Sequence, residues 1–347
     1  MFDNNSFKFV LYFLVAFFAT SFVTPIAIRM AFRLKIIDAP NERKVHKYSK
    51  PRVGGVAMFA VYFLLLLSLD LSFSTTKALL VGSVLITFFG FLDDLFGIRA
   101  MAKLIFQIMV ALITASDNFG FGIKIESVRL LSDFTLELGV FAVPITIIWI
   151  VAVMNAVNLI DGLDGLAAGI SAIASFTMGI CAIIFGQIQI ALIFFILLGV
   201  ILGFLRYNFN PAKLFMGDAG SLFLGYNLAV LSVLAIWNTP RVFVFTIPIL
   251  LLGIPFYDVL TSIFRRWKNK KPIFSADGNH IHHRIMAIGF SHKQTVIIVY
   301  IETLCLAICC ATIILINDNK AVLVFMAIVI LVHFSYDYLI RVYLEEE

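Results

Sequence analysis

The sequence predicts an all-α integral membrane protein with about eleven transmembrane helices. Of its 347 residues, 61% are hydrophobic and only 14% are charged, and the mean hydropathy is +1.02. A soluble globular domain is about half apolar and about a quarter charged. Long apolar runs recur along the whole chain, which is typical of spanning helices rather than of a barrel. No internal repeat or low-complexity segment is evident, so we expect one domain over residues 1–347.

The expected spans follow from the apolar runs, which are close to the length of about 17 to 25 residues that a crossing helix needs. They cover 8–33, 53–71, 76–92, 99–116, 137–156, 165–186, 188–206, 219–237, 241–263, 294–316 and 320–342. The N-terminus lacks a basic leader and a cleavage site, so we interpret it as the first span. The loop at 117–137 alternates weakly, which is consistent with a small hairpin. The four cysteines fall in spans without metal-ligand spacing, so we expect them to pack as small apolar residues.

The connecting loops differ strongly in charge. With eleven spans, 20 of the 26 lysine and arginine residues fall on one side of the membrane. Cytoplasmic loops carry such an excess of basic residues. We therefore expect an outside N-terminus and a cytoplasmic C-terminus.

The most polar stretch between apolar spans is NAVNLIDGLDG, at residues 155–165. Two amides and two carboxylates recur there at every third position: Asn155, Asn158, Asp161 and Asp164. In an α-helix this spacing drifts around the cylinder, whereas a tighter turn at Gly162 and Gly165 would let the four side chains converge. A polar loop with helix caps is the alternative, but it needs one or two such groups rather than four. Polar clusters at a membrane boundary indicate a functional site.

Two further acidic stretches fall on the same predicted side. Asp93 and Asp94 lie where the third span should end, where acids oppose the helix dipole, so we expect that capping does not explain them. Neighbours on a helix point about 100° apart, so we expect different roles for the two, one facing the reacting group and the other a cation or a basic partner. Asp218 lies in a Gly-rich stretch before the eighth span. It is either a helix N-cap or a metal ligand, with glycines that let phosphate approach closely.

The two most basic loops complete the pattern. The basic charge of the loop at 38–57 has two explanations. One is the usual excess of basic residues in cytoplasmic loops together with attraction to anionic lipid, and the other is a direct role in holding phosphate. The loop at 265–285 contains three histidines and an arginine: His280, His282, His283 and Arg284. No thiolates lie nearby for a structural zinc site, and these side chains can donate hydrogen bonds to phosphate oxygens. A solvated polar loop is the alternative.

Few polar residues fall inside the spans. For Asp258 and Glu302 we expect interhelix pairing rather than catalysis. His333 and Asp337 fall in the last span. The acidic, amide and histidine clusters together favour one composite site for Mg²⁺ and a diphosphate, because Mg²⁺ prefers oxygen ligands and shares them with substrate phosphates.

Five motifs, in this order and with suitable spans between them, resemble the polyprenyl-phosphate N-acetylhexosamine-1-phosphate transferases (glycosyltransferase family 4). They are PNERKVHKYSKPRVGG, FLDDLFG, NAVNLIDGLDGLAAG, FMGDAGSLFLG and PIFSADGNHIHHR. The histidine stretch looks like the undecaprenyl-phosphate N-acetylglucosamine-1-phosphate transferases of O-antigen, common antigen and teichoic acid synthesis. The peptidoglycan branch, which transfers phospho-N-acetylmuramoyl-pentapeptide, has ten spans and three consecutive histidines followed by an acid. Ile281, Arg284 and the eleven expected spans favour the first branch.

The resemblance implies transfer of a sugar 1-phosphate from a UDP-sugar to undecaprenyl phosphate, with release of UMP, at the cytoplasmic face of the inner membrane. N-acetylglucosamine 1-phosphate is the default group, but the sequence does not name the sugar. No nucleic-acid partner is implied, and a homodimer is allowed. The peptidoglycan transferase is the alternative within the family. A multi-span transporter is the alternative outside it, although transporter sites usually lie near the midplane on related repeats.

The resemblance also assigns roles to single residues. It implies Mg²⁺, with Mn²⁺ as an alternative, held by Asn158 and Asp218. Asp93 and Asp94 are the expected catalytic pair, and Asp93 would deprotonate or orient the lipid phosphate. The expected substrate-binding residues are Asn155, Asp161, Asp164, His280, His282, His283 and Arg284. Direct attack and a two-step route through a phosphorylated carboxylate are both compatible with these residues.

Overall fold

The computed structural model describes residues 4–38, 50–69, 73–131, 134–237, 239, 244–270, 272 and 280–315. Within these ranges the chain forms twelve α-helices, as the all-α prediction requires. Their bounds are α1 Asn4–Leu34, α2 Gly54–Leu67, α3 Phe73–Phe96, α4 Ala100–Ala115, α5 Ala142–Ile160, α6 Leu166–Ile184, α7 Ile188–Asn208, α8 Gly217–Ser232, α9 Thr246–Leu251, α10 Gly253–Lys268, α11 Ile281–Ala287 and α12 His292–Leu315. A π-helical turn, Val233–Trp237, continues α8.

Two short hairpins accompany the helices. β1 (Ile37–Asp38) pairs with β2 (Lys50–Pro51), and β3 (Ser127–Leu131) pairs with β4 (Phe134–Glu137), both antiparallel. The second pair confirms the hairpin expected in the loop at 117–137. Two 3₁₀ turns, Asp117–Phe119 and Gly139–Phe141, flank it.

Seven helical segments in the described ranges are long and apolar enough to cross a membrane. They are Phe7–Leu34, Lys77–Phe96, Gly139–Ile160, Leu166–Ile184, Ile188–Asn208, Gly217–Trp237 and His292–Leu315. α2 and α4 are shorter apolar helices that match two further expected spans. The expected span at 320–342, with His333 and Asp337, and most of the loop at 38–57 lie outside the described residues. The protein is thus a multi-span helical membrane protein, while the total of eleven spans and the orientation stay predictions.

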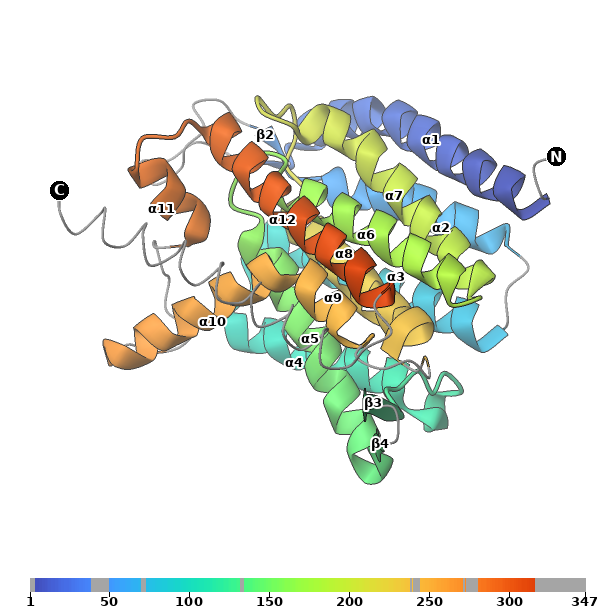
Figure 1. The fold of residues 1–347 in the computed structure, drawn as a ribbon. Coiled ribbons are helices and arrows are strands. Elements are labelled where there is room, and N and C mark those ends of the chain that lie inside the picture. Colours follow the sequence, from blue (N-terminus) through green and yellow to red (C-terminus); the bar gives the residue numbers. More distant parts are fainter. Residues whose placement is uncertain are drawn as a thin grey trace.

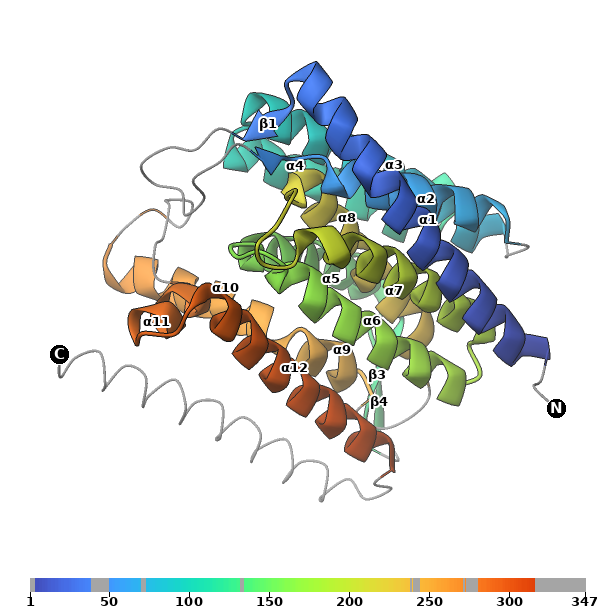
Figure 2. The same cartoon turned by 90° about the horizontal axis from the view of Figure 1, so that it is seen from above.

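The expected ninth span at 241–263 is wrong as one continuous helix. The chain there forms α9 and α10, separated at Leu252. Pro255 explains the break, because proline lacks the N–H that would bond to the carbonyl of residue 251 and its ring clashes with that carbonyl. In Figures 1 and 2, α10 leads away from the bundle, toward the end at which α11 lies.

α8 lies at the centre of the bundle and is buried along nearly its whole length. It packs against α2, α3 and α5, while α1, α7 and α6 form a neighbouring layer (Figure 2). The approach of α3 to the start of α8 depends on Gly90, where a Cβ would lie 2.6 Å from Cα of Ala219. This contact brings the Asp93–Asp94 end of α3 against Asp218.

Candidate active site

Asp93 and Asp94 diverge, as the sequence predicts for neighbours on a helix. The carboxylate of Asp94 accepts hydrogen bonds from the backbone N–H groups of Asp218 (2.9 Å) and Ala219 (3.1 Å). It therefore caps α8, where an anion at a helix N-terminus is favourable. The expectation that capping does not explain the pair is wrong for Asp94, because it considered only the helix that carries the acids. Asp93 turns the other way. Its Oδ1 accepts from the N–H of Ile98 (2.7 Å), and its Oδ2 forms an ion pair with Lys103.

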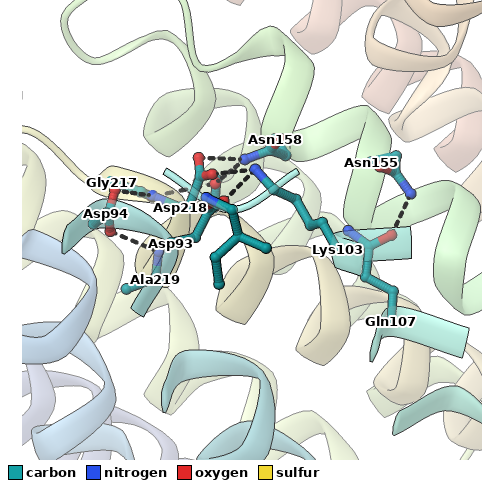
Figure 3. Close-up of polar contacts among 11 residues, drawn as sticks. Asp93, Asp94, Lys103, Gln107, Asn155, Asn158, Gly217, Asp218 and Ala219 are labelled. Carbon is teal, nitrogen blue, oxygen red and sulfur yellow. Dashed lines mark hydrogen bonds and ion pairs between the residues drawn. The ribbon is translucent and has the colours of Figure 1, made fainter. Parts of the chain in front are cut away.

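Lys103 links two of the expected site residues. Its ammonium forms ion pairs with both Asp93 and Asp218, as Figure 3 shows. On the far side of Asp218, Nδ2 of Asn158 donates to Oδ1 of Asp218 (2.9 Å) and to Oγ of Ser221 (2.8 Å). In the sequence, Lys103 counted only as one of the basic residues on the predicted cytoplasmic side. Its placement inside an apolar helix, just after an acidic pair, is the signal that could have identified it.

Asn155 lies one helical turn before Asn158, but it makes a different contact. Its Nδ2 donates to Oε1 of Gln107 (2.6 Å) and to the carbonyl of Val151 (2.8 Å). Gln107 lies one turn after Lys103, so this bond ties α5 to α4 beside the charged cluster (Figure 3). The structure gives Asn155 an interhelix partner, and its expected contact with substrate stays a prediction.

Residues 161–165 form the expected tight turn between α5 and α6. Oδ2 of Asp164 accepts from the N–H of Ala212 (2.9 Å) and from the side chains of Asn210 (3.3 Å) and Lys50 (3.4 Å). Asp164 thus holds the turn against two other segments. The pKa of Asp161 is raised to about 8, first by burial and then by the negative charges of Asp218 and Asp94.

The backbone of the same turn is held by α7 and α12. The N–H of Gly165 donates to Oδ1 of Asn208 (3.0 Å), and its carbonyl accepts from the hydroxyl of Tyr300 (2.5 Å). The N–H of Asp164 donates to Nε2 of His292 (2.9 Å). Side chains of α7 and α12 therefore hold the turn in place through hydrogen bonds to both its N–H and its C=O groups.

The histidine loop meets this turn from α11. His282 is buried, and its Nε2 lies where a Cβ on Gly162 would have to be. Burial lowers the pKa of His282 to about 3, with a further contribution from the neighbouring His283, so His282 is neutral near pH 7. Burial also lowers the pKa of His283. Nδ1 of His280 lies 2.7 Å from Oδ2 of Asp258.

The turn, the start of α8 and the histidine loop enclose one cavity of about 580 Å³. Its lining includes six of the expected residues: Asp94, Asn158, Asp161, Asp164, Asp218 and His283. Lys50 and Arg52 also line it, and both belong to the basic loop for which the sequence left a role in holding phosphate open. His292 lines it too, although the sequence did not single it out. Asp93, Asn155, His280, His282 and Arg284 do not line it. The cavity brings together residues that are more than two hundred positions apart in the chain, from Lys50 to His292.

The charged cluster has the chemistry of a cation site. The ammonium of Lys103 lies between Asp93 and Asp218, so these carboxylates already face a positive charge. Among the described residues, no three His, Cys, Asp or Glu side chains are placed to hold a metal ion. Asn158 turns its Nδ2 toward Oδ1 of Asp218 (2.9 Å), so the expected pair of Mg²⁺ ligands stays a prediction. An ion that keeps waters and takes further oxygens from substrate phosphates, as Mg²⁺ does, needs few protein ligands.

Comparison with known proteins finds one matching family model and several similar proteins. A model of glycosyl transferase family 4 matches residues 76–236, which contain Asp93, Lys103, Asn158 and Asp218. The chain is 41% identical to a probable undecaprenyl-phosphate N-acetylglucosaminyl 1-phosphate transferase of Bacillus subtilis (strain 168), over 87% of this chain and 84% of that protein. It is 34% identical to a decaprenyl-phosphate N-acetylglucosaminephosphotransferase of Mycobacterium leprae (strain TN), over 83% and 79% of the two chains.

The peptidoglycan branch is represented at lower identity. A phospho-N-acetylmuramoyl-pentapeptide-transferase of Prochlorococcus marinus (strain MIT 9301) is 28% identical, over 83% of this chain and 85% of that protein. The relatives that are 41% and 34% identical over most of both chains confirm the resemblance inferred from the five motifs. The chain belongs to glycosyl transferase family 4.

Proposed function

We propose that this protein transfers N-acetylglucosamine 1-phosphate from its UDP-sugar to a polyprenyl phosphate, with undecaprenyl phosphate as the acceptor, and releases UMP. The convergence of the acidic, amide, histidine and basic stretches on one cavity carries this proposal. The relatives that are 41% and 34% identical are named for transfer of N-acetylglucosamine phosphate to undecaprenyl and decaprenyl phosphate, which supports the sugar and the lipid class. The lower identity to the pentapeptide transferase makes that reaction the weaker alternative.

In the proposed reaction an oxygen of the lipid phosphate attacks the β-phosphorus of the UDP-sugar. The bond from this phosphorus to the bridging oxygen breaks, and UMP leaves with that oxygen. A phosphate monoester has a second pKa of about 6, so the lipid phosphate is already mostly ionised at pH 7. Removing a proton from it therefore contributes little, and the main barrier is the approach of one anion to another.

The residues of the cavity lower this barrier by electrostatic stabilisation and by positioning, as in other phosphoryl transfers. Lys50 and Arg52 supply positive charge to the diphosphate, and His283 donates to its oxygens. Asn158 and Asp218 would hold Mg²⁺, which when bound neutralises charge on the diphosphate. Asp93 fixes Lys103, and the ammonium of Lys103 orients the lipid phosphate. Asp161 and Asp164, on the clamped turn, position the nucleotide.

We further propose that the cavity opens to the cytoplasm, which the distribution of 20 of 26 basic residues supports. UDP-sugars are then available on the side where the cavity opens. The isoprenoid chain would lie in the membrane, with its phosphate at the cytoplasmic surface.

The decisive experiment is a panel of UDP-sugars incubated with purified protein, Mg²⁺ and undecaprenyl phosphate, with UMP quantified and each lipid product identified by mass. We expect UMP and undecaprenyl-diphospho-N-acetylglucosamine from UDP-N-acetylglucosamine. UMP release from none of the sugars would reject the proposal. Release of UMP without lipid acceptor would favour the two-step route over direct attack.

Asp93→Asn tests the division of roles within the site. Because Asp93 does not line the cavity, this variant should bind UDP-N-acetylglucosamine as the wild type does while its turnover falls. Calorimetric titration and UMP release measure the two quantities separately. Lost binding with retained turnover would reverse the assignment.

A further inference from the structure

The carboxylate of Asp258, on α10, is fully buried and has both oxygens occupied. Oδ1 accepts a hydrogen bond from the N–H of Ile281 (2.7 Å), the first residue of α11, and Oδ2 lies 2.7 Å from Nδ1 of His280. A buried carboxylate is costly unless it is paired and hydrogen-bonded. The contact therefore fixes where α11 begins relative to α10.

His280 carries this contact toward the cavity. Its ring is parallel to that of His282, with an interplanar angle of 3° and centroids 5.7 Å apart, and the rings of His282 and His283 lie 4.3 Å apart. His282 packs against Gly162 of the turn, and His283 lines the cavity. The order in space is therefore Asp258, His280, His282 and then the turn that carries Asp161.

We propose that Asp258 is a positioning residue for the transferase site, and that it acts through Nδ1 of His280. It holds the start of α11 so that His282 stands against Gly162 and His283 faces the cavity. His280 then serves as the link between Asp258 and His282, and its Nε2 does not bind the diphosphate. This inference rests on the proposed function. The sequence predicted that His280, His282 and His283 all bind substrate, whereas here only His283 does so and the rings of His280 and His282 support it.

Two amide variants of His280 separate the two ring nitrogens. The amide nitrogen of asparagine lies about where Nδ1 lies, and that of glutamine about where Nε2 lies. His280→Asn should keep the bond to Asp258 and retain kcat within about threefold, whereas His280→Gln should lose it and fall by about tenfold to a hundredfold, as for partners that orient metal-bound histidines. The reverse order, with His280→Gln the more active variant, would overturn the proposal and return His280 to the substrate.

Asp258→Asn tests the carboxylate itself through a double-mutant cycle. The amide has the same size as the carboxylate, but it presents an N–H₂ group either to Nδ1 of His280 or to the N–H of Ile281. The substitution should lower kcat about tenfold in the wild-type background, but less than about threefold when His280→Gln is already present. Equal losses in the two backgrounds would mean that Asp258 acts independently of His280 and would overturn the proposal.

Glu302→Gln is the matched control, because it removes a half-buried carboxylate on α12 that does not line the cavity. It should retain wild-type kcat. Thermal unfolding in detergent checks that each variant folds, and if Asp258→Asn does not fold, the His280 pair decides alone. If the wild type releases no UMP, the proposed function fails. The contact between Asp258 and Nδ1 of His280 is then tested by thermal stability. His280→Asn should have a higher melting temperature than His280→Gln, and the opposite order would refute the contact's role.

Discussion

Lys103→Met removes the ammonium between Asp93 and Asp218 while keeping an unbranched side chain of similar length. The side chains of Lys103 and Asp93 are 19% and 5% exposed, so water replaces little of the lost interaction on that side. Asp218 is 31% exposed and can be partly rehydrated. Removing one partner of a buried ion pair costs about 3 to 5 kcal/mol, and we expect the lower end, about 3 kcal/mol of unfolding free energy.

The same change should also lower turnover. If the ammonium contributes a similar energy to holding the lipid phosphate in the transition state, 3 kcal/mol corresponds to about a hundredfold in kcat/KM for the lipid. Loss of the ammonium leaves the two carboxylates facing each other. Mg²⁺ should therefore raise the melting temperature of Lys103→Met by more than it raises that of the wild type.

The assays are thermal unfolding in detergent, with and without Mg²⁺, and UMP release at varied lipid concentration. Lys124→Met is the matched control, since Lys124 pairs with the exposed Asp117 (2.6 Å) away from the cavity. Exposed ion pairs contribute little to stability, so this variant should resemble the wild type. Wild-type turnover of Lys103→Met, or equal effects of the two substitutions, would refute the role assigned to Lys103.

Three further predictions concern the cavity. Asp218→Ala should abolish UMP release at every Mg²⁺ concentration, and wild-type activity of the variant would remove Asp218 from the proposed ligands. Gly162→Ala should push His282 away and raise KM for UDP-N-acetylglucosamine about tenfold, since overpacking costs about 1 to 3 kcal/mol; an unchanged KM contradicts this. The pKa of His282 is lowered to about 3 in the folded protein, so between pH 6.5 and 3 only the unfolded chain takes up this proton and stability falls as pH falls. Comparison of unfolding free energy with that of His282→Gln should isolate a loss of about 2 kcal/mol between pH 7.5 and 5, and identical pH dependence of the two proteins would reject it.

Patterns of neighbouring residues predicted the helices and the tight turn, because these elements depend mainly on local sequence. Apolar runs placed the membrane helices, and glycines at 162 and 165 placed the turn that brings Asp161 to the cavity. The break between α9 and α10 was missed although Pro255 signals it, because mean hydropathy stays high across the break. Hydropathy reports burial, whereas the break depends on one missing N–H.

The partners of the polar residues could not be predicted in the same way. Asp94 caps α8 from 124 positions away, and Lys103 meets Asp218 across 115. Such contacts depend on which helices pack together, and a single sequence carries no local signal for that choice. Asp258 shows the same limit, because interhelix pairing was expected for it, but its partner in the histidine loop was not.

The clamp on the turn at 161–165 has a consequence for biosynthesis. Two of its contacts, from His292 and Tyr300, come from α12, which follows the turn by more than a hundred residues. A chain still emerging from the ribosome has the carboxylates and amides of the turn but cannot yet hold them in place. The clamp on the turn, and with it the proposed nucleotide pocket, is therefore complete only when α12 has been made and has packed against α6.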